Sequence, residues 1–119
     1  MTVTLTRVGL ARYGSDLAGA LSYGHQRLLE VAMGLALAPR LLILDEPTQG
    51  LAAGEITRFK ALLQSLVPGM TILLIEHNME VVMELADRIT VLQAGQVLAC
   101  GSPAEVRANP AVQRAYLGA

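Results

Sequence analysis

The sequence predicts an α/β fold built around a parallel β-sheet. Residues 41–45 and 71–76 are short apolar runs typical of strands, and residues 55–67 between them carry apolar side chains at helical spacing. A strand, a helix and a second strand in this order almost always form a right-handed crossover between parallel strands. The mean hydropathy of +0.47 is high, and we attribute the excess to strands buried on both faces of such a sheet.

The first third of the chain is predicted to be mainly helical. Residues 3–12 are weakly helical, residues 16–23 form a loop of small side chains, and residues 25–38 form a helix that Pro39 ends. The helix at residues 55–67 has one apolar stripe, which consists of Ile56, Phe59, Leu62, Leu63 and Leu66.

The next elements are predicted to be a helix and a β-hairpin. The hairpin pairs residues 89–92 with residues 97–99 around the turn Ala94-Gly95. The helix before it has an inner stripe made of Met79, Val82, Met83 and Ala86.

Two short helices are predicted at the C-terminal end. Ser102 is a candidate N-cap, Pro103 suits the first helical position, and Glu105 lies at capping-box spacing. Asn109 begins the second helix, which Gly118 ends. These signals are structural.

The composition argues against several classes of function. The formal net charge is −1 and the nine Lys and Arg residues are scattered, which gives no basic stripe for nucleic acid. Pro39-Arg40 interrupts the longest apolar stretch, which is then too short for a membrane span. The single cysteine, Cys100, excludes an internal disulfide, and its apolar neighbours predict a core position. With no secretory signal in the first residues, these features favour a cytoplasmic domain.

Asp45 and Glu46 are the first candidate site residues. The crossover brings them to the same sheet edge as Glu76-His77, and open α/β folds bind ligands at that edge. Asp45 can hold Mg²⁺, which in phosphate sites takes one or two carboxylates plus water. Glu46 can accept a proton from an attacking water, or orient that water, during phosphoryl transfer. The alternative is that these residues form only a solvated turn.

His77 is the second candidate catalytic residue. A single histidine after a strand is more often a surface residue or one with its hydrogen bonds satisfied. Beside Glu46, its imidazole can donate a hydrogen bond to a γ-phosphate or hold the attacking water.

Residues 21–26 form a candidate phosphate-binding segment. Ser22 offers a hydroxyl, Gly24 allows a ligand to approach the backbone closely, and the positive end of the following helix favours an anion. The alternative is an ordinary N-cap followed by a helix.

The order of three segments resembles the nucleotide-binding subunits of ABC transporters. The segments are Leu-Ser-Tyr-Gly-His-Gln at 21–26, Leu-Leu-Ile-Leu-Asp-Glu-Pro at 41–47 and Ile-Glu-His at 75–77. The resemblance spans nearly the whole chain and implies part of a P-loop NTPase (RecA-like) sheet with flanking helices. Residues 1–38 would be a remnant of the helical subdomain, and residues 39–119 the C-terminal part of the ATPase core, with its hairpin and short helices.

The resemblance also implies roles for individual residues. Asp45 would be the Walker B aspartate that holds Mg²⁺, Glu46 the catalytic glutamate and His77 the switch histidine. Residues 48–52 would be the D-loop. These groups would serve ATP held in their own subunit.

The implied partners follow from the same resemblance. Two ATPase subunits of this family dimerise head to tail, so the signature residues would contact ATP bound to the partner; they are Ser22, Gly24 and His25. The stretch at 75–79 and the ending at 109–118 are most similar to the branched-chain amino-acid (LivG-type) importer ATPases. That similarity implies transmembrane permease subunits and, indirectly, a periplasmic or extracellular solute-binding protein, with the chain at the inner face of the cell membrane.

One part of the ATP site does not occur in the sequence. A phosphate loop needs a Gly-rich turn ending in Gly-Lys-Ser/Thr, but the only lysine, Lys60, lies inside an amphipathic segment. That loop holds the β- and γ-phosphates, so we expect these residues alone to bind Mg²⁺ and ATP weakly and to lack ATPase activity. Within the motifs, His25 stands where the family usually has Gln or Glu, and Ala52 stands where the D-loop usually has Asp or a polar substitute.

Three functions fit these observations. The first is the C-terminal fragment of an ABC importer ATPase. The second is a non-catalytic binding module that pairs with a complete ABC ATPase. The third is an ABC ATPase of DNA repair or translation, which is disfavoured because the sequence has neither a long coiled-coil insertion nor a tandem domain.

Overall fold

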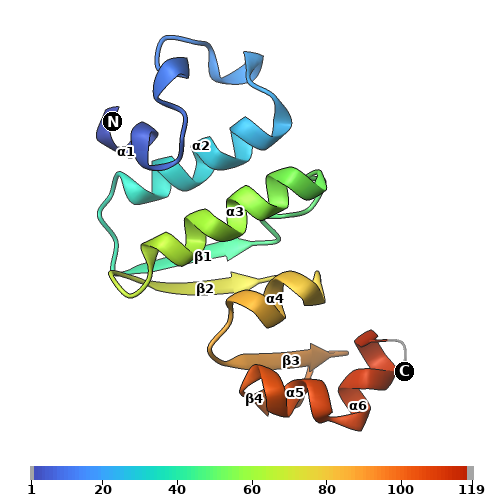
Figure 1. Ribbon diagram of the computed structural model, residues 1–119. Helices are drawn as coiled ribbons and strands as arrows, with labels where there is room; N and C mark the ends of the chain where they lie inside the picture. The colour runs from blue at the N-terminus through green and yellow to red at the C-terminus, as the bar shows by residue number, and fades with distance from the viewer. Residues whose placement is uncertain (1, 118–119) are drawn as a thin grey trace. The chain divides into compact units, whose positions relative to one another are not determined.

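The structure is a computed structural model that describes residues 2–117 (Figure 1). Its contacts divide the chain into two units, Met1–Ile75 and Glu76–Ala119, which are described in turn. The elements confirm the predicted α/β class. Among the described residues, no helix combines the length and apolar character needed to cross a bilayer. The division of family subdomains at residue 38 stays a prediction.

The first part of unit one is helical, as predicted. Helix α1 spans Thr2–Arg7, and the 3₁₀ turns η1 (Ala11–Tyr13) and η2 (Ala18–Ala20) lead to helix α2 (Tyr23–Leu35). The predicted loop therefore contains a 3₁₀ turn, and α2 starts two residues earlier than expected.

The predicted strand–helix–strand unit is confirmed. Strand β1 (Leu41–Asp45) is followed by helix α3 (Ala53–Leu66) and strand β2 (Thr71–Ile75). The strands are parallel, as their arrows show in Figure 1, and Asp45 is opposite Ile75 in the register. Their C-terminal ends therefore lie at one edge of the sheet.

The prediction that these strands are buried on both faces is wrong. On β1, Leu42 is buried, whereas Leu41 and Ile43 are 52% and 57% exposed. On β2, Leu73 and Ile75 are 51% and 49% exposed. Successive side chains of a strand point to opposite faces, and the helices of unit one pack on only one of them. We call the four exposed residues the open face.

The core of unit one lies between its helices and the covered face of the sheet. The predicted stripe of α3 is confirmed, with Phe59 only 1% exposed and only Ile56 half-buried. Helix α2 comes close to β1 at Gly34, where a Cβ would lie 3.0 Å from Leu42 Cδ1. The buried residues of α2 are Gly24, Val31, Ala32 and Leu35.

The open face leads to a prediction about association. Each strand has only one neighbour within the described chain, so strand edges and apolar side chains are exposed together. We expect the purified chain to associate as its concentration rises, measured by light scattering. Ile43→Lys should shift it toward monomer, whereas Leu17→Lys, at another exposed leucine, should not. A monodisperse monomer at all concentrations would contradict the prediction.

The second unit begins with helix α4 and the predicted hairpin. Helix α4 spans Met79–Leu85, and strands β3 (Ile89–Gln93) and β4 (Gln96–Gly101) pair antiparallel. The turn residues Ala94 and Gly95 have φ of 51° and 78°. Two positive φ values are the mark of a type I′ turn, which matches the twist of the strands it joins.

The predicted C-terminal helices are confirmed as far as the described residues extend. Helix α5 spans Pro103–Ala108, and Ser102 and Glu105 form the expected capping box. Helix α6 (Pro110–Val112) continues into a π-helical segment, Gln113–Leu117. The predicted stop at Gly118 lies outside the described residues.

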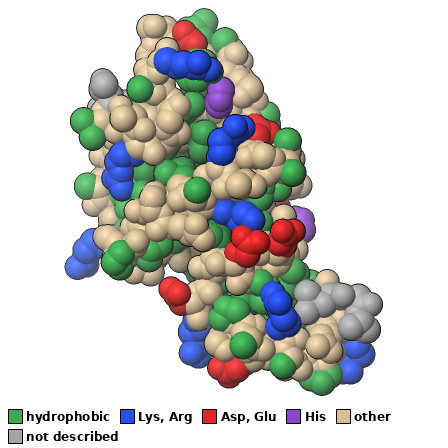
Figure 2. Space-filling model, in the orientation of Figure 1, with side chains coloured by type: hydrophobic (Ala, Val, Ile, Leu, Met, Phe, Trp, Pro, Cys, Tyr) green, Lys and Arg blue, Asp and Glu red, His purple; other side chains and the backbone are tan. Residues whose placement is uncertain are grey.

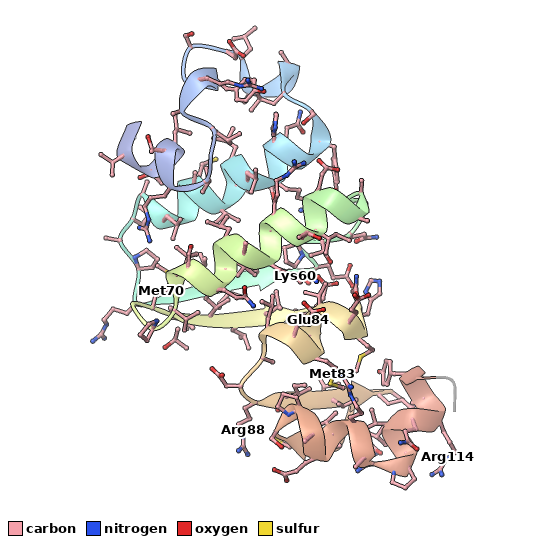
Figure 3. The ribbon with its side chains drawn as sticks, viewed as in Figure 1. Lys60, Met70, Met83, Glu84, Arg88 and Arg114 are labelled. Carbon is pink, nitrogen blue, oxygen red and sulfur yellow. The ribbon has the colours of Figure 1, made fainter. Side chains whose placement is uncertain are left out.

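The core of unit two consists of Ile89, Val91, Val106 and Val112. From the predicted stripe, Val82, Met83 and Ala86 pack against this cluster, and Figure 3 labels Met83 on α4. Val81, which is 1% exposed, is a buried residue of α4 that the sequence did not predict.

The predicted core position of Cys100 is wrong. Its thiol is exposed on β4, 3.4 Å from the Thr90 hydroxyl and 3.3 Å from the Arg88 guanidinium. The hydrogen bond with Thr90 and, to a smaller extent, the positive charge of Arg88 lower the pKa of the Cys100 thiol. The apolar residues around Cys100 predicted burial, but one face of the hairpin is exposed to solvent and Cys100 lies on it.

Candidate functional site

Asp45 and Glu46 stand where β1 ends. Asp45 is the last strand residue and is exposed, and the Glu46 N–H donates to the Ile75 carbonyl at 2.7 Å. The ladder between the strands therefore continues one residue past Asp45. Pro47 and Thr48 that follow are buried, so the backbone beneath both carboxylates is anchored on each side.

Glu46 has an unusual backbone conformation. Its φ is 47°, in the left-handed region that few residues other than glycine adopt. Such conformations cost free energy and occur preferentially at functional sites. Ala38 and Ala94 have similar φ values after a helix and in the hairpin turn, so the conformation of Glu46 is compatible with a functional site and with a simple turn alike.

The donor set around Asp45 is sparse. In residues 2–117 no group of three or more His, Cys, Asp or Glu side chains could hold a metal ion by itself. A dedicated protein cage is therefore absent from the described chain. An exposed carboxylate at a strand end does fit Mg²⁺, because that ion keeps several waters and takes its other ligands from substrate phosphates.

His77 begins the turn that leads into α4. Its backbone N–H donates to Glu76 Oε1 at 3.2 Å, and the N–H of Asn78 donates to the same oxygen at 3.4 Å. Asn78 then caps α4 by accepting from the Val81 N–H. His77 and Glu46 belong to different units, so the predicted proximity of their side chains stays a prediction.

The start of α2 confirms the N-cap reading of Ser22. Ser22 has extended backbone angles, and its Oγ accepts the His25 N–H at 3.2 Å. The hydroxyl side chain of Ser22 is nevertheless exposed. Cap and phosphate-binding roles are compatible, because a hydroxyl has two acceptor lone pairs and one donor.

His25 lies against another aromatic ring. The His25 and Tyr13 ring centroids are 4.7 Å apart with an interplanar angle of 45°, and the Arg12 guanidinium lies 4.7 Å from the Tyr13 centroid. This contact fixes the side of the helix on which the imidazole lies.

Gly24 is closely approached, but by a carboxylate of the same chain. A Cβ at this position would lie 1.6 Å from Glu55 Oε2. The other oxygen of that carboxylate, Oε1, accepts the Ala52 N–H at 3.0 Å. Only glycine therefore fits at position 24 while Glu55 keeps this rotamer.

Tyr23 links α2 to the predicted D-loop. Its hydroxyl donates to the Gln49 carbonyl at 3.1 Å and accepts from Arg27 Nε at 3.0 Å. Arg27 also pairs with Glu30 at 3.1 Å. Burial alone would lower the pKa of Arg27, but these hydrogen bonds with Tyr23 and Glu30 outweigh it and raise that pKa.

Sequence reasoning missed Tyr23 and Glu55. The Ala52-x-x-Glu55 spacing at the start of α3 was an available signal, because a glutamate at the third helical position often reaches back to the N-cap N–H. No comparable signal marks Tyr23, whose partner is 26 residues away.

Lys60 lies in the middle of α3 (Figure 3), as the amphipathic pattern predicts. A phosphate-loop lysine instead follows a Gly-rich turn at a helix start. Figure 2 also shows the Lys and Arg side chains scattered over the visible face, not gathered in a stripe.

Comparisons with known proteins agree with these motifs. Residues 1–49 match a family model described as ABC transporter, and residues 96–119 match one described as branched-chain amino acid ATP-binding cassette transporter. The chain is 45% identical over 116 residues to the high-affinity branched-chain amino acid transport ATP-binding protein BraF of Pseudomonas aeruginosa. It is also 45% identical over 116 residues to LivG of Escherichia coli K12, a protein of the same description. Each match covers 96% of this chain and 46% of the relative, so the chain spans about half the length of these proteins.

Solved structures give the same result. An ATP-binding cassette of an ABC transporter, in its ADP conformation, matches with a TM-score of 0.86 and 29% identity, over 99% of this chain and 48% of that one. A component of an ABC transporter complex from Clostridium perfringens matches with a TM-score of 0.81 and 32% identity, over 94% of this chain and 45% of that one. Motif order, fold and relatives therefore agree: the chain belongs to the ABC transporter family of ATP-binding proteins and is similar, over about half of their length, to members described as branched-chain amino acid transport proteins.

Proposed function

We propose that this chain provides the signature segment and the catalytic carboxylates of an ATP-binding subunit in an importer of branched-chain amino acids. The observation that carries the proposal is the position of Asp45 and Glu46 directly after β1, with Glu46 held at φ 47° by its hydrogen bond to the end of β2. The names of the similar proteins suggest the transported solute.

In this proposal the carboxylates act on the subunit's own nucleotide. The Asp45 carboxylate would hold Mg²⁺, which when bound neutralises charge on phosphate oxygens. Glu46 would orient the attacking water and accept its proton. His77 would donate a hydrogen bond toward the γ-phosphate or the same water.

The start of α2 would act on the nucleotide of a second ATPase subunit. Ser22 would donate its hydroxyl to a phosphate oxygen, and the backbone of Gly24 and the side chain of His25 would lie beside it. Their placement at the positive end of a helix of 13 residues supports this role.

The proposed assembly places the subunit at the cytoplasmic face of a membrane. It would dimerise with another ATPase subunit and bind transmembrane permease subunits, which receive solute from an extracytoplasmic binding protein. The phosphate loop must come from outside these 119 residues, since Lys60 is the only lysine.

The test is a chimeric subunit. Residues 1–119 replace the matching portion of Escherichia coli LivG, and the chimera is expressed in a strain lacking that protein. We expect uptake of leucine, isoleucine and valine to be restored, whereas the 119-residue chain alone shows no ATP hydrolysis above background. A chimera that folds and accumulates but restores no uptake would contradict the proposal, and so would hydrolysis by the chain alone.

A second candidate function is a binding module without catalysis. It is favoured by the exposure of Ser22 while its hydroxyl caps α2, because such a module needs only the start of α2 and the partner's nucleotide. In that case Asp45→Asn would leave the chimera's transport unchanged.

A further inference from the structure

The start of α2 and the loop after Glu46 are joined in unit one. These segments, residues 22–27 and 48–52, are separate motifs in the sequence, and 20 residues or more separate them. Three side-chain contacts connect them, two from Tyr23 and one from Glu55.

Tyr23 makes the first two contacts. Its hydroxyl donates to the Gln49 carbonyl at 3.1 Å. Its ring lies against Gly50, where an added Cβ would be 3.1 Å from Tyr23 Cε1, and Gly50 has φ of 81°. Arg27, at hydrogen-bond distance from the Tyr23 hydroxyl, restricts the ring from the α2 side.

Glu55 makes the third contact. One carboxylate oxygen caps the Ala52 N–H at the start of α3, and the other lies against the backbone of Gly24. Ala52 has no polar side chain to cap α3 itself, so the reach of Glu55 is what holds this end of the loop.

The contacts continue to the backbone of Glu46. The Gln49 N–H donates to the Glu46 carbonyl at 3.3 Å, and the Glu46 N–H donates to the Ile75 carbonyl. Gln49 therefore links the two segments to Glu46, because its carbonyl accepts from the Tyr23 hydroxyl and its N–H donates to the Glu46 carbonyl.

We propose that Tyr23 and Glu55 are positioning residues that hold the start of α2 against the loop after Glu46, so that binding at one segment sets the position of the other. Neither residue touches the reacting atoms. The structural coupling stands on contacts within unit one, and its catalytic consequence rests on the proposed function. Coupling of this kind is reciprocal.

Hydrogen exchange of the 119-residue chain tests the coupling directly. Tyr23→Phe removes one hydroxyl and should speed exchange of the amides of residues 48–52 by roughly 2- to 10-fold, the effect of one hydrogen bond. Glu55→Ala should speed exchange of the amides of His25 and Gln26 across the contact, and Glu55→Gln, which keeps an acceptor for Ala52, should restore most of the protection.

The matched control is Tyr116→Phe, which also removes a hydroxyl that donates to a backbone carbonyl, that of Leu92 in unit two. It should leave exchange in both segments unchanged. The amide of Leu63, which is buried within α3, reports on the overall stability of unit one. If a substitution speeds amide exchange only in the segment next to the substituted residue, and not in the other segment, the proposal is overturned. If Glu55→Ala fails to fold, the exchange of residues 48–52 in Tyr23→Phe is sufficient to test the proposal.

The chimera separates this proposal from the proposed function. There Tyr23→Phe should lower kcat of ATP hydrolysis while leaving KM for ATP unchanged, because it alters position and not binding. An unchanged kcat would refute the catalytic consequence. If the chimera is inactive both with Tyr23 and with the Tyr23→Phe substitution, the proposed function is contradicted. Hydrogen exchange then still tests whether the two segments are coupled.

Discussion

Glu46→Gln in the chimeric subunit should lower the rate of ATP hydrolysis by about 100-fold or more, the usual contribution of a positioned general base. The amide keeps the size and hydrogen-bonding reach of the side chain but cannot accept the proton of the attacking water. The backbone hydrogen bond from Glu46 to Ile75 is the same in both variants, so we expect the fold to be kept. The measurement is steady-state ATPase activity of the purified chimera in its assembled transporter.

The matched control is Glu80→Gln, which neutralises an exposed carboxylate in the first turn of α4. It should leave turnover within about 2-fold of the parent, since surface substitutions away from special features have small effects. If both variants lose ATPase activity equally, the loss is an effect of removing negative charge and not of removing a general base. Undiminished activity of Glu46→Gln would remove Glu46 from the mechanism.

Phe59→Ala should lower the free energy of unfolding by about 3–5 kcal/mol, the range for removing a buried aromatic side chain. Phe59 is 1% exposed and lines the same hollow as Leu42 and Leu44 of β1. Small domains have only about 5–15 kcal/mol of stability, so this change should leave unit one largely unfolded at moderate temperature. Urea denaturation followed by circular dichroism measures the loss.

Leu37→Ala is the control for Phe59→Ala. Leu37 is 83% exposed after the end of α2, so its truncation should change stability by less than about 0.5 kcal/mol. If the two variants lose similar free energy, Phe59 is not the centre of the core.

The helices and strands were predictable because their signals are local in the sequence. Short apolar runs located β1 and β2, apolar residues at helical spacing located α3, and the two-residue turn Ala94-Gly95 located the hairpin. The capping box at Ser102 is a pattern of three residues and needs no tertiary information. Parallel pairing was predictable from the helix between the two strands, because such helical crossovers usually join parallel strands.

Burial was less predictable, because it depends on what covers each face. An apolar run is the same whether both of its faces are covered or one is open, so the sequence could not foresee the exposure of Ile43 or Cys100. In the candidate site, motif order located Asp45, Glu46 and Ser22. The contacts of Tyr23 and Glu55 depend on rotamers and on residues distant in sequence.

The open face of β1 and β2 also bears on the thermodynamics of the chain. The heat capacity change of unfolding arises from apolar surface that becomes hydrated, and Leu41, Ile43, Leu73 and Ile75 are already about half hydrated. Unit one should therefore have a smaller heat capacity change per residue, and a flatter curve of stability against temperature, than a domain whose sheet is covered on both faces. A polypeptide that covers this face would increase the heat capacity change, so calorimetry would detect such an association directly.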